Sequence, residues 1–150
     1  MINRLAFILL KNISYFLRPF RHGYYIRILQ RAYEIQGVIF KGDVKYIHHD
    51  VYIDNIGEVI IGENVVISTR CILLAHDYSS LVYKKNPRCI SKLTIGNNCF
   101  IGAGAILLPG TIIGNNCIIG AGSVVKGTIP NNSVVIGNPC KILKTISKDE

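Results

Sequence analysis

The chain has 150 residues, of which 49% are apolar and 17% are charged. This length and composition predict one ordered domain with a sizeable core and exclude a disordered segment. The formal net charge is +8, but the basic residues are not interleaved along an element that could read a nucleic-acid groove, so nucleic-acid binding is not expected.

The N-terminal segment, residues 1–36, holds most of the excess positive charge. It has six arginine and lysine residues against Glu34 alone, a net charge of +5. Apolar residues recur at helical spacing over residues 1–20 and again over 24–35, which predicts two helices. The longest apolar run, Leu5 to Leu10, is far shorter than the roughly 20 residues that cross a bilayer. Two interpretations stay open: the helices cap the end of the fold, or they contact an anionic membrane surface.

A six-residue repeat follows in the second half of the chain. A large aliphatic residue opens every hexad: Ile95, Ile101, Leu107, Ile113, Ile119 and Val125. The fifth place of each hexad is small: Cys99, Ala105, Thr111, Cys117 and Ser123. A helical period would spread these aliphatic residues around a cylinder, whereas short strands with a turn in every hexad keep them on one side. A single hexad cannot bury its own aliphatic residue, so the units must stack, as in a parallel β-helix.

Weaker hexads precede this region and are interrupted twice. They open at Ile47, Ile53, Ile61, Ile67 and Leu73. Eight residues separate Ile53 from Ile61, so the register slips by two and a corner should bulge outward around residues 55–57. After Leu73 the repeat stops for a polar and basic insertion over residues 77–92. A long loop in so regular a scaffold is typical of binding or of subunit contacts.

These patterns divide the chain into three segments. We expect a basic helical segment over residues 1–36, a parallel β-helix over 37–143 and a polar tail over 144–150. The polar stretch that begins at Lys141 could start with a short helix.

The five cysteines do not form a disulfide framework. Cys71, Cys99 and Cys117 fall in the small fifth place, where cysteine acts as a compact apolar filler. No Cys-X-X-Cys pair and no zinc-like spacing of cysteine and histidine occurs in the sequence, so no metal site is expected. Together with the lack of a signal-peptide pattern, this predicts a cytoplasmic location, at the inner face of the membrane if the N-terminal segment binds lipid.

Three short motifs resemble those of a known family. Ile101–Ala105, Ile119–Ser123 and Gly137–Lys141 are similar to the motifs of the hexapeptide-repeat acyltransferases, which include maltose, galactoside, xenobiotic and capsule-sugar O-acetyltransferases. The resemblance covers roughly Ile47 to Leu143. It implies a left-handed β-helix with three hexads per coil, a homotrimer, acetyl-coenzyme A as the donor, and a hydroxyl of a sugar or cell-surface polysaccharide intermediate as the acceptor.

His76 is the candidate catalytic residue, because it stands where the regular coils stop and the insertion begins. In the resembling enzymes a histidine at this point, often in a His-Asp pair, is the general base. The acceptor hydroxyl must lose a proton as it attacks the thioester, and imidazole titrates near neutral pH. Asp77 is adjacent, but neighbouring side chains in a strand point in opposite directions, so the group that orients His76 stays open. The candidate substrate-binding residues are His48, Asp50 and Asp77.

The candidate donor site combines small residues with lysines. Ala103 and Gly104 lie eighteen residues before Ala121 and Gly122, so the two pairs are stacked if three hexads make one coil, and they leave a smooth wall for a pantetheine arm. Lys126 and Lys141 are the nearest cations for the phosphates. The family commonly has Thr-Lys-Asp where this chain has Lys126-Gly127-Thr128, so the first lysine is displaced by one place.

Several alternatives stay open at this point. Acetylation of an amino group on a sugar or nucleotide sugar would use the same donor. A carbonic anhydrase on the same fold would need three histidine ligands, and the spacing of His48, His49 and His76 argues against it. Covalent catalysis through Cys89 or Cys140 lacks a neighbouring histidine in the sequence. A non-catalytic scaffold would not be stabilised by coenzyme A.

Overall fold

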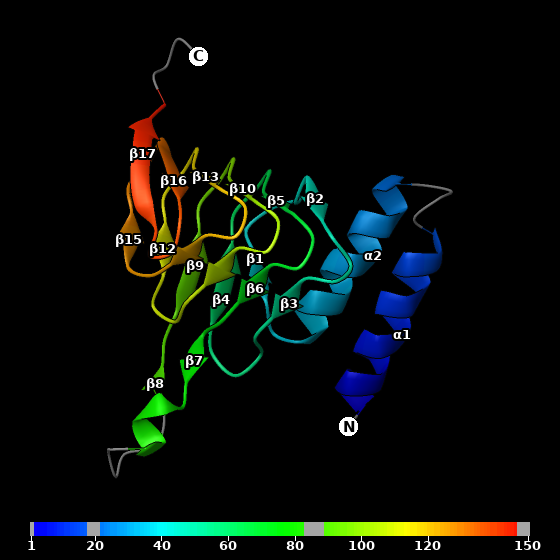
Figure 1. Cartoon of the computed structure of the whole chain (residues 1–150). Helices are drawn as coiled ribbons and strands as arrows, with labels where there is room; N and C mark the ends of the chain where they lie inside the picture. The colour runs from blue at the N-terminus through cyan, green and yellow to red at the C-terminus, as the bar shows by residue number, and fades with distance from the viewer. Residues whose placement is uncertain (1, 18–21, 83–88, 147–150) are drawn as a thin grey trace.

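The computed structural model describes residues 2–17, 22–82 and 89–146, and Figure 1 shows their arrangement. Parts of the predicted first helix (18–20) and of the insertion (83–88) lie outside the described residues. The two helices are α1 (Ile2–Leu17) and α2 (His22–Ile35), which confirms the predicted helical segment. The strands are β1 (Ile39–Phe40), β2 (Tyr46–Ile47), β3 (Tyr52–Ile53), β4 (Val59–Ile61), β5 (Val66–Ile67), β6 (Ile72–Leu73), β7 (His76–Asp77), β8 (Cys89–Ile90), β9 (Leu93–Ile95), β10 (Phe100–Ile101), β11 (Ile106–Leu107), β12 (Ile112–Ile113), β13 (Ile118–Ile119), β14 (Val124–Val125), β15 (Thr128–Ile129), β16 (Ser133–Ile136) and β17 (Lys141–Thr145).

Three sheets form the walls of the domain. Sheet A has the order β1-β4-β9-β12-β15, sheet B the order β2-β5-β10-β13-β16-β17, and sheet C the order β3-β6-β11-β14. The chain visits the three sheets in turn, and all pairs are parallel except that of β16 with β17. Each circuit is therefore one triangular coil, and the coils stack along one axis (Figure 1). This is the predicted left-handed parallel β-helix.

The hexad residues fill the interior as their period predicts. The six aliphatic residues from Ile95 to Val125 are at most 1% exposed, and the small residues of the fifth place are at most 2% exposed. One large and one small side chain per hexad let neighbouring coils approach to the usual strand spacing of about 4.8 Å.

The register of the coils varies where the sequence predicts it. Phe100 pairs with Ile118, eighteen residues later, as three hexads require. Ile53 pairs with Leu73, twenty residues later, which confirms the predicted slip of two. Ile72 pairs with Ile106, a spacing of 34 rather than 18, so sixteen residues are inserted between these coils. The described ends of this insertion, β7 and β8, pair in antiparallel fashion and project from the β-helix (Figure 1).

Asparagine residues stack at the corner between sheets A and B. Four of them, Asn64, Asn98, Asn116 and Asn132, have positive φ angles of 55 to 60°. Asparagine tolerates this left-handed conformation better than most residues. Their side-chain amides bond along the axis, from Asn64 to Asn98 at 2.8 Å and from Asn116 to Asn132 at 2.9 Å. The ladder ties consecutive coils together outside the core.

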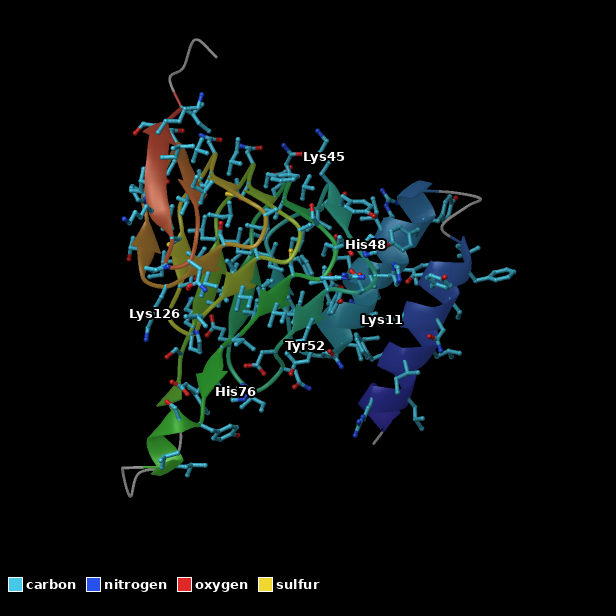
Figure 2. All side chains as sticks on the ribbon, in the orientation of Figure 1. Lys11, Lys45, His48, Tyr52, His76 and Lys126 are labelled. Carbon is cyan, nitrogen blue, oxygen red and sulfur yellow. The ribbon has the colours of Figure 1, made fainter. Side chains whose placement is uncertain are left out.

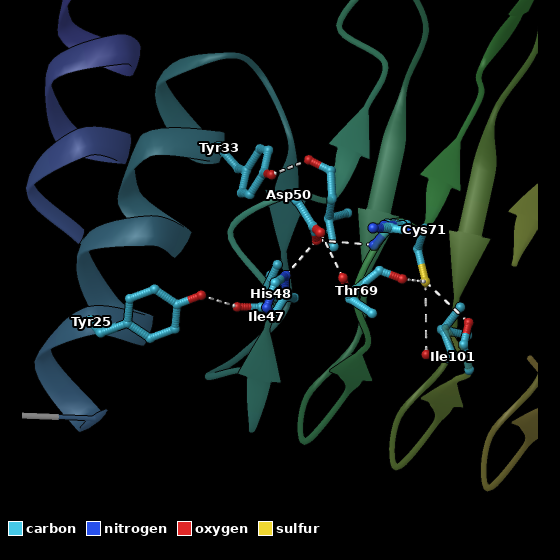
Figure 3. A network of polar contacts seen from close by, with 11 residues as sticks. Tyr25, Tyr33, Ile47, His48, Asp50, Thr69, Cys71 and Ile101 are labelled. Atoms are coloured by element: carbon cyan, nitrogen blue, oxygen red, sulfur yellow. Dashed lines mark hydrogen bonds and ion pairs between the residues drawn. The ribbon is translucent and has the colours of Figure 1, made fainter. Parts of the chain in front are cut away.

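Helix α2 covers the N-terminal end of the β-helix. Its buried face includes Tyr25, Leu29 and Tyr33. The Tyr25 hydroxyl donates to the Ile47 carbonyl at 2.9 Å, and the Tyr33 hydroxyl donates to that of Val51 at 2.6 Å (Figure 3). Helix α1 lies on the outer side of α2 (Figure 1). Within the described ranges, neither helix is long and apolar enough to cross a membrane.

The stretch that begins at Lys141 forms a strand, so the helical start considered for it is wrong. Strand β17 pairs with β16, with Ile136 opposite Lys141 and Ser133 opposite Thr145. Without β17, the β-helix would end at an unpaired edge of β16, whose backbone groups need hydrogen-bond partners. Strand β17 supplies these partners, whereas a helix would not.

Candidate active site

His76 and Asp54 meet at the corner where sheet C turns toward sheet A. Asp54 directly follows β3, and its backbone N–H donates to the Leu73 carbonyl at 2.9 Å. His76 lies three residues after Leu73 and begins the projecting hairpin. The Nδ1 atom of His76 contacts the Oδ2 atom of Asp54. The two-residue slip after Ile53 gives the chain the extra length that turns the carboxylate toward the next coil.

The Asp54 carboxylate is held in its charged form. Its Oδ2 atom also accepts the Ala75 N–H at 2.9 Å, and its Oδ1 atom accepts the Ile56 N–H at 3.0 Å. Burial alone would raise the pKa of Asp54, but the hydrogen bonds from His76, Ile56 and Ala75 outweigh burial and lower the pKa below its usual range. Asp54 is therefore an acceptor at every contact.

This environment fixes the tautomer of His76. Since Asp54 is a carboxylate, the Nδ1 atom of His76 must donate the hydrogen, and in the neutral ring the Nε2 atom therefore carries the lone pair. The edge of the His76 ring meets the Tyr78 ring, with centroids 4.8 Å apart and planes at 63°. The His76 side chain is 19% exposed. The His76 ring is thus oriented by Asp54 and partly exposed to solvent.

Asp77 and Lys126 lie on the same side of the β-helix as His76. The Asp77 carboxylate accepts the Ser79 N–H at 2.7 Å. The hydrogen bonds from Ser79 lower the pKa of Asp77, and the nearby charge of Lys126 lowers it further. Figure 2 shows Lys126 and His76 on the side from which the hairpin projects. Asp77 does not orient His76; Asp54 occupies that position.

His48 and Asp50 form a second pair at the corner between sheets B and C. The Nδ1 atom of His48 contacts Asp50, which also accepts the Thr69 hydroxyl at 2.6 Å and the Arg70 N–H at 2.9 Å (Figure 3). Burial would raise the pKa of Asp50, but these hydrogen bonds hold it well below its usual range. The two histidine-aspartate pairs thus lie at opposite edges of sheet C.

The small residues predicted for donor binding also lie at this second corner. The Gly122 N–H donates to the Ala103 carbonyl at 2.8 Å, and the Gly104 N–H donates to that of Thr69 at 2.9 Å. Ala103 and Gly104 are therefore stacked with Ala121 and Gly122, as expected from their spacing. Lys141 opens β17, and the preceding Cys140 N–H donates to the Val124 carbonyl at 3.1 Å. The width of sheet C separates this stack from His76 and Lys126.

Cys71, Cys99 and Cys117 are buried and behave as fillers. Burial raises the pKa of Cys71 and of Cys99 to about 11, so both thiols are protonated at neutral pH and neither is a nucleophile. Cys140 is partly exposed and free, and the side chain of Cys89 lies outside what the structure describes. Among the described residues, no three histidine, cysteine, aspartate or glutamate side chains come together as a metal site would require.

The sequence reasoning missed Asp54 and Tyr78. The signal for Asp54 was present, because an aspartate directly after a strand and before a register slip can face the next coil. The signal for Tyr78 was its place two residues after His76, on the same side of an extended segment.

The site lies on a fold that defines a class of protein: a left-handed parallel β-helix of hexapeptide repeats, interrupted at one corner by a histidine-bearing hairpin. The family profile described as "Bacterial transferase hexapeptide (six repeats)" matches residues 92–127. WbbJ of Escherichia coli (strain K12), provisionally named a lipopolysaccharide biosynthesis O-acetyl transferase, is 35% identical over an alignment of 120 residues, which covers 73% of this chain and 61% of WbbJ.

Solved structures align with nearly the whole chain. A galactoside acetyltransferase in complex with coenzyme A has a TM-score of 0.65 and 25% identity, over 98% of this chain and 82% of that one. The maltose O-acetyltransferase of Clostridium difficile 630 has a TM-score of 0.62 and 24% identity, over 99% of this chain and 90% of that one. The chain belongs to the hexapeptide-repeat acetyltransferase family. It spans less than two thirds of the length of WbbJ.

Proposed function

We propose that the protein is an acetyl-coenzyme A-dependent O-acetyltransferase that acts on a sugar or a cell-surface polysaccharide intermediate, with His76 as the general base. The observation that supports this most is the contact between His76 and the buried carboxylate of Asp54. It leaves the Nε2 atom of His76 able to accept a proton and accessible to a substrate.

The reaction follows from that geometry. The acceptor hydroxyl gives its proton to His76 Nε2 as its oxygen attacks the thioester carbonyl of acetyl-coenzyme A. The imidazolium that forms is stabilised by the Asp54 carboxylate. The tetrahedral intermediate then collapses, the carbon-sulfur bond breaks, and His76 returns the proton to the departing thiolate. The products are the acetyl ester and coenzyme A.

Two sets of residues support donor binding: the stacked small residues and the two lysines. The stacked small residues Ala103, Gly104, Ala121 and Gly122 leave a smooth wall against which an extended pantetheine arm can lie, and no atom lies within 4 Å of a Cβ atom added at Gly104 or Gly122. Lys126 and Lys141 offer positive charge for the phosphates. A single subunit places the stack and His76 at different edges of sheet C, so we further propose a homotrimer in which the stack of one subunit faces His76 of another. Sedimentation or light scattering tests the trimer.

The acceptor is proposed to be a sugar hydroxyl because of the relatives' names. WbbJ is provisionally named for lipopolysaccharide biosynthesis, and the two structural relatives are named for galactoside and maltose. His48, Asp50 and Asp77 are the polar side chains proposed to contact the acceptor. Parallel assays with amino sugars distinguish this proposal from N-acetylation. An N-acetyltransferase would release coenzyme A only when the acceptor carries an amino group.

The decisive experiment follows thiol release from acetyl-coenzyme A in the presence of a panel of sugars and glycans. We expect His76→Ala to lower the rate by at least about 100-fold, the usual contribution of a general base. Coenzyme A at about 100 times its dissociation constant should still stabilise this variant by about 2.7 kcal/mol. Transfer at a near wild-type rate would refute the role of His76. A wild-type protein that coenzyme A does not stabilise would favour the scaffold.

A further inference from the structure

Helix α1 presents an apolar stripe to the outside of the molecule. Five large side chains recur at helical spacing along it and are between 39% and 72% exposed: Leu5, Ile8, Leu9, Ile13 and Phe16. The opposite face, which includes Phe7 and the buried Ser14, packs toward α2. Packing against α2 uses that opposite face and leaves the stripe exposed. An exposed group of large apolar side chains on a surface helix, here interrupted by Asn12, marks an interaction site.

The N-terminal segment that carries the stripe has charges of one sign. The first 33 residues contain six arginine and lysine residues and no aspartate or glutamate. Within the described helices, Arg4 and Arg27 are exposed, and Arg31 pairs with Glu34, the first acidic residue of the chain. An apolar helix face in a basic segment complements a surface that is apolar inside and negatively charged outside.

We propose that the α1 stripe docks the protein onto an anionic lipid surface. The helix lies in the plane of the headgroups, with Leu5, Leu9 and Phe16 inserted between the acyl chains. Its 16 residues are too few to span the bilayer, so the contact is peripheral and reversible. Because α1 is the outermost element at its end of the molecule (Figure 1), it can reach a flat surface without interference from the β-helix.

A second copy of this chain fits the same stripe less well. Two α1 helices that packed against each other would bring together two 33-residue segments that each contain six basic residues and no acidic residue. That contact would be opposed by repulsion, whereas anionic lipid headgroups are attracted by the same charges. The charge pattern therefore favours lipid over self-association.

The test exploits the absence of tryptophan from the chain. A Leu9→Trp variant of the full chain carries one reporter in the stripe, and Leu143→Trp carries one in β17 at the other end of the β-helix. The two leucines are matched in exposure, at 61% and 62%. With vesicles of phosphatidylcholine that contain about 30% phosphatidylglycerol, we expect a blue shift of emission and quenching by brominated acyl chains for Leu9→Trp only.

Loss-of-function variants complete the test. In co-sedimentation with the same vesicles, the double variant Leu9→Glu/Phe16→Glu should lose at least about tenfold in partition coefficient, and Leu143→Glu should bind like the wild type. Circular dichroism verifies that each variant is folded. High salt should weaken binding, because screening removes the attraction to the headgroups.

Three outcomes would overturn the proposal: emission of Leu9→Trp unchanged by anionic vesicles, equal binding to vesicles of pure phosphatidylcholine, or a change of oligomeric state in Leu9→Glu/Phe16→Glu without vesicle binding by the wild type. The last would assign the stripe to a second copy. None of these measurements needs acetyl-coenzyme A or an acceptor, so the result is independent of whether the protein transfers acetyl groups.

Discussion

The Asp54 carboxylate accepts a hydrogen bond from the His76 ring across 22 residues of sequence, at the corner where the β-helix is interrupted. The same carboxylate accepts two backbone N–H groups, from Ile56 and Ala75. Its orientation is thus determined by both coils that it connects, and the imidazole takes its orientation from Asp54. If His76 is the base, Asp54 is the residue that positions it.

The variant Asp54→Asn should retain the fold but lose most activity. The amide can accept from only one of its two terminal atoms, so His76 is no longer held as the Nδ1–H tautomer. We expect the rate to fall by about 10- to 100-fold, as for the loss of a group that orients a functional histidine, with an altered pH-rate profile and little change in the KM for acetyl-coenzyme A. Steady-state kinetics over a range of pH measures the rate, the pH-rate profile and the KM.

Asp43→Asn is the matched control for that change. It makes the same chemical substitution at an exposed aspartate of the corner between sheets A and B, and it should leave the rate unaltered. A rate for Asp54→Asn within twofold of the wild type would contradict the positioning role.

Lys126 and Lys141 can be tested separately as phosphate-binding residues. Each exposed charge should contribute up to about 1 kcal/mol, so Lys126→Ala and Lys141→Ala should raise the KM for acetyl-coenzyme A by about two- to fivefold. A donor that lacks the 3′-phosphate distinguishes the two roles, because the lysine that binds this phosphate should no longer affect the KM. Lys45→Ala removes an exposed lysine from another corner (Figure 2) and should have no effect.

The sequence predicted the fold because the residues that recur every six positions are the residues that form the core. Every coil must put an aliphatic residue such as Ile101 or Ile119 inside, so the period of the structure appears directly in the chain. The slip of two after Ile53 was visible for the same reason. Helix α2 followed from the spacing of its apolar residues, among which Tyr25 is fully buried.

Contacts between coils were harder to predict than the coils. Asp54 lies opposite Leu74 only because the slip shifts its coil by two residues relative to the next, and spacing alone does not show which side chains a bulged corner brings together. The strand β17 was missed because its residues are exposed, so they carry no hydrophobic period. It pairs with the free edge of β16, whose backbone groups need hydrogen-bond partners, and this need leaves no pattern in the side chains.

Gly57 is expected to tolerate no side chain. A Cβ atom added at Gly57 would lie 2.3 Å from the carbonyl oxygen of Ala75 and 2.6 Å from its Cβ atom. The coil that carries His76 would have to move, so Gly57→Ala should reduce the free energy of unfolding by about 1–3 kcal/mol and impair transfer as well. Urea denaturation measures the first effect.

Gly23→Ala is its matched control. No atom lies within 4 Å of the added Cβ atom, and the position is helical, so stability should stay the same or rise by up to about 1 kcal/mol. Equal stabilities of Gly57→Ala and the wild type would show that the corner is not closely packed.

Asn98 should stabilise the β-helix in two separable ways. Its φ angle of 56° costs an ordinary residue about 1–2 kcal/mol, and its side chain accepts from Asn64 and donates to Asn116. Asn98→Ala loses both contributions, whereas Asn98→Gly loses the hydrogen bonds but keeps the conformation. We therefore expect the alanine variant to be the less stable of the two in urea denaturation, and the reverse order would refute the conformational part.

Asp50 should make the protein sensitive to acid. Its pKa in the folded protein lies well below the value of about 3.9 of an unfolded chain, so the unfolded state binds more protons as the pH falls. The stabilisation that the ionised Asp50 carboxylate contributes is complete above about pH 5, and it is lost as the pH falls toward the pKa of Asp50 in the folded protein. In Asp50→Asn, stability should be lower than wild type at neutral pH, and the difference should shrink on acidification. Thr69→Val removes one donor to Asp50 and should give a smaller change of the same sign. Urea midpoints measured over pH test this, and wild-type and Asp50→Asn curves that ran parallel would contradict it.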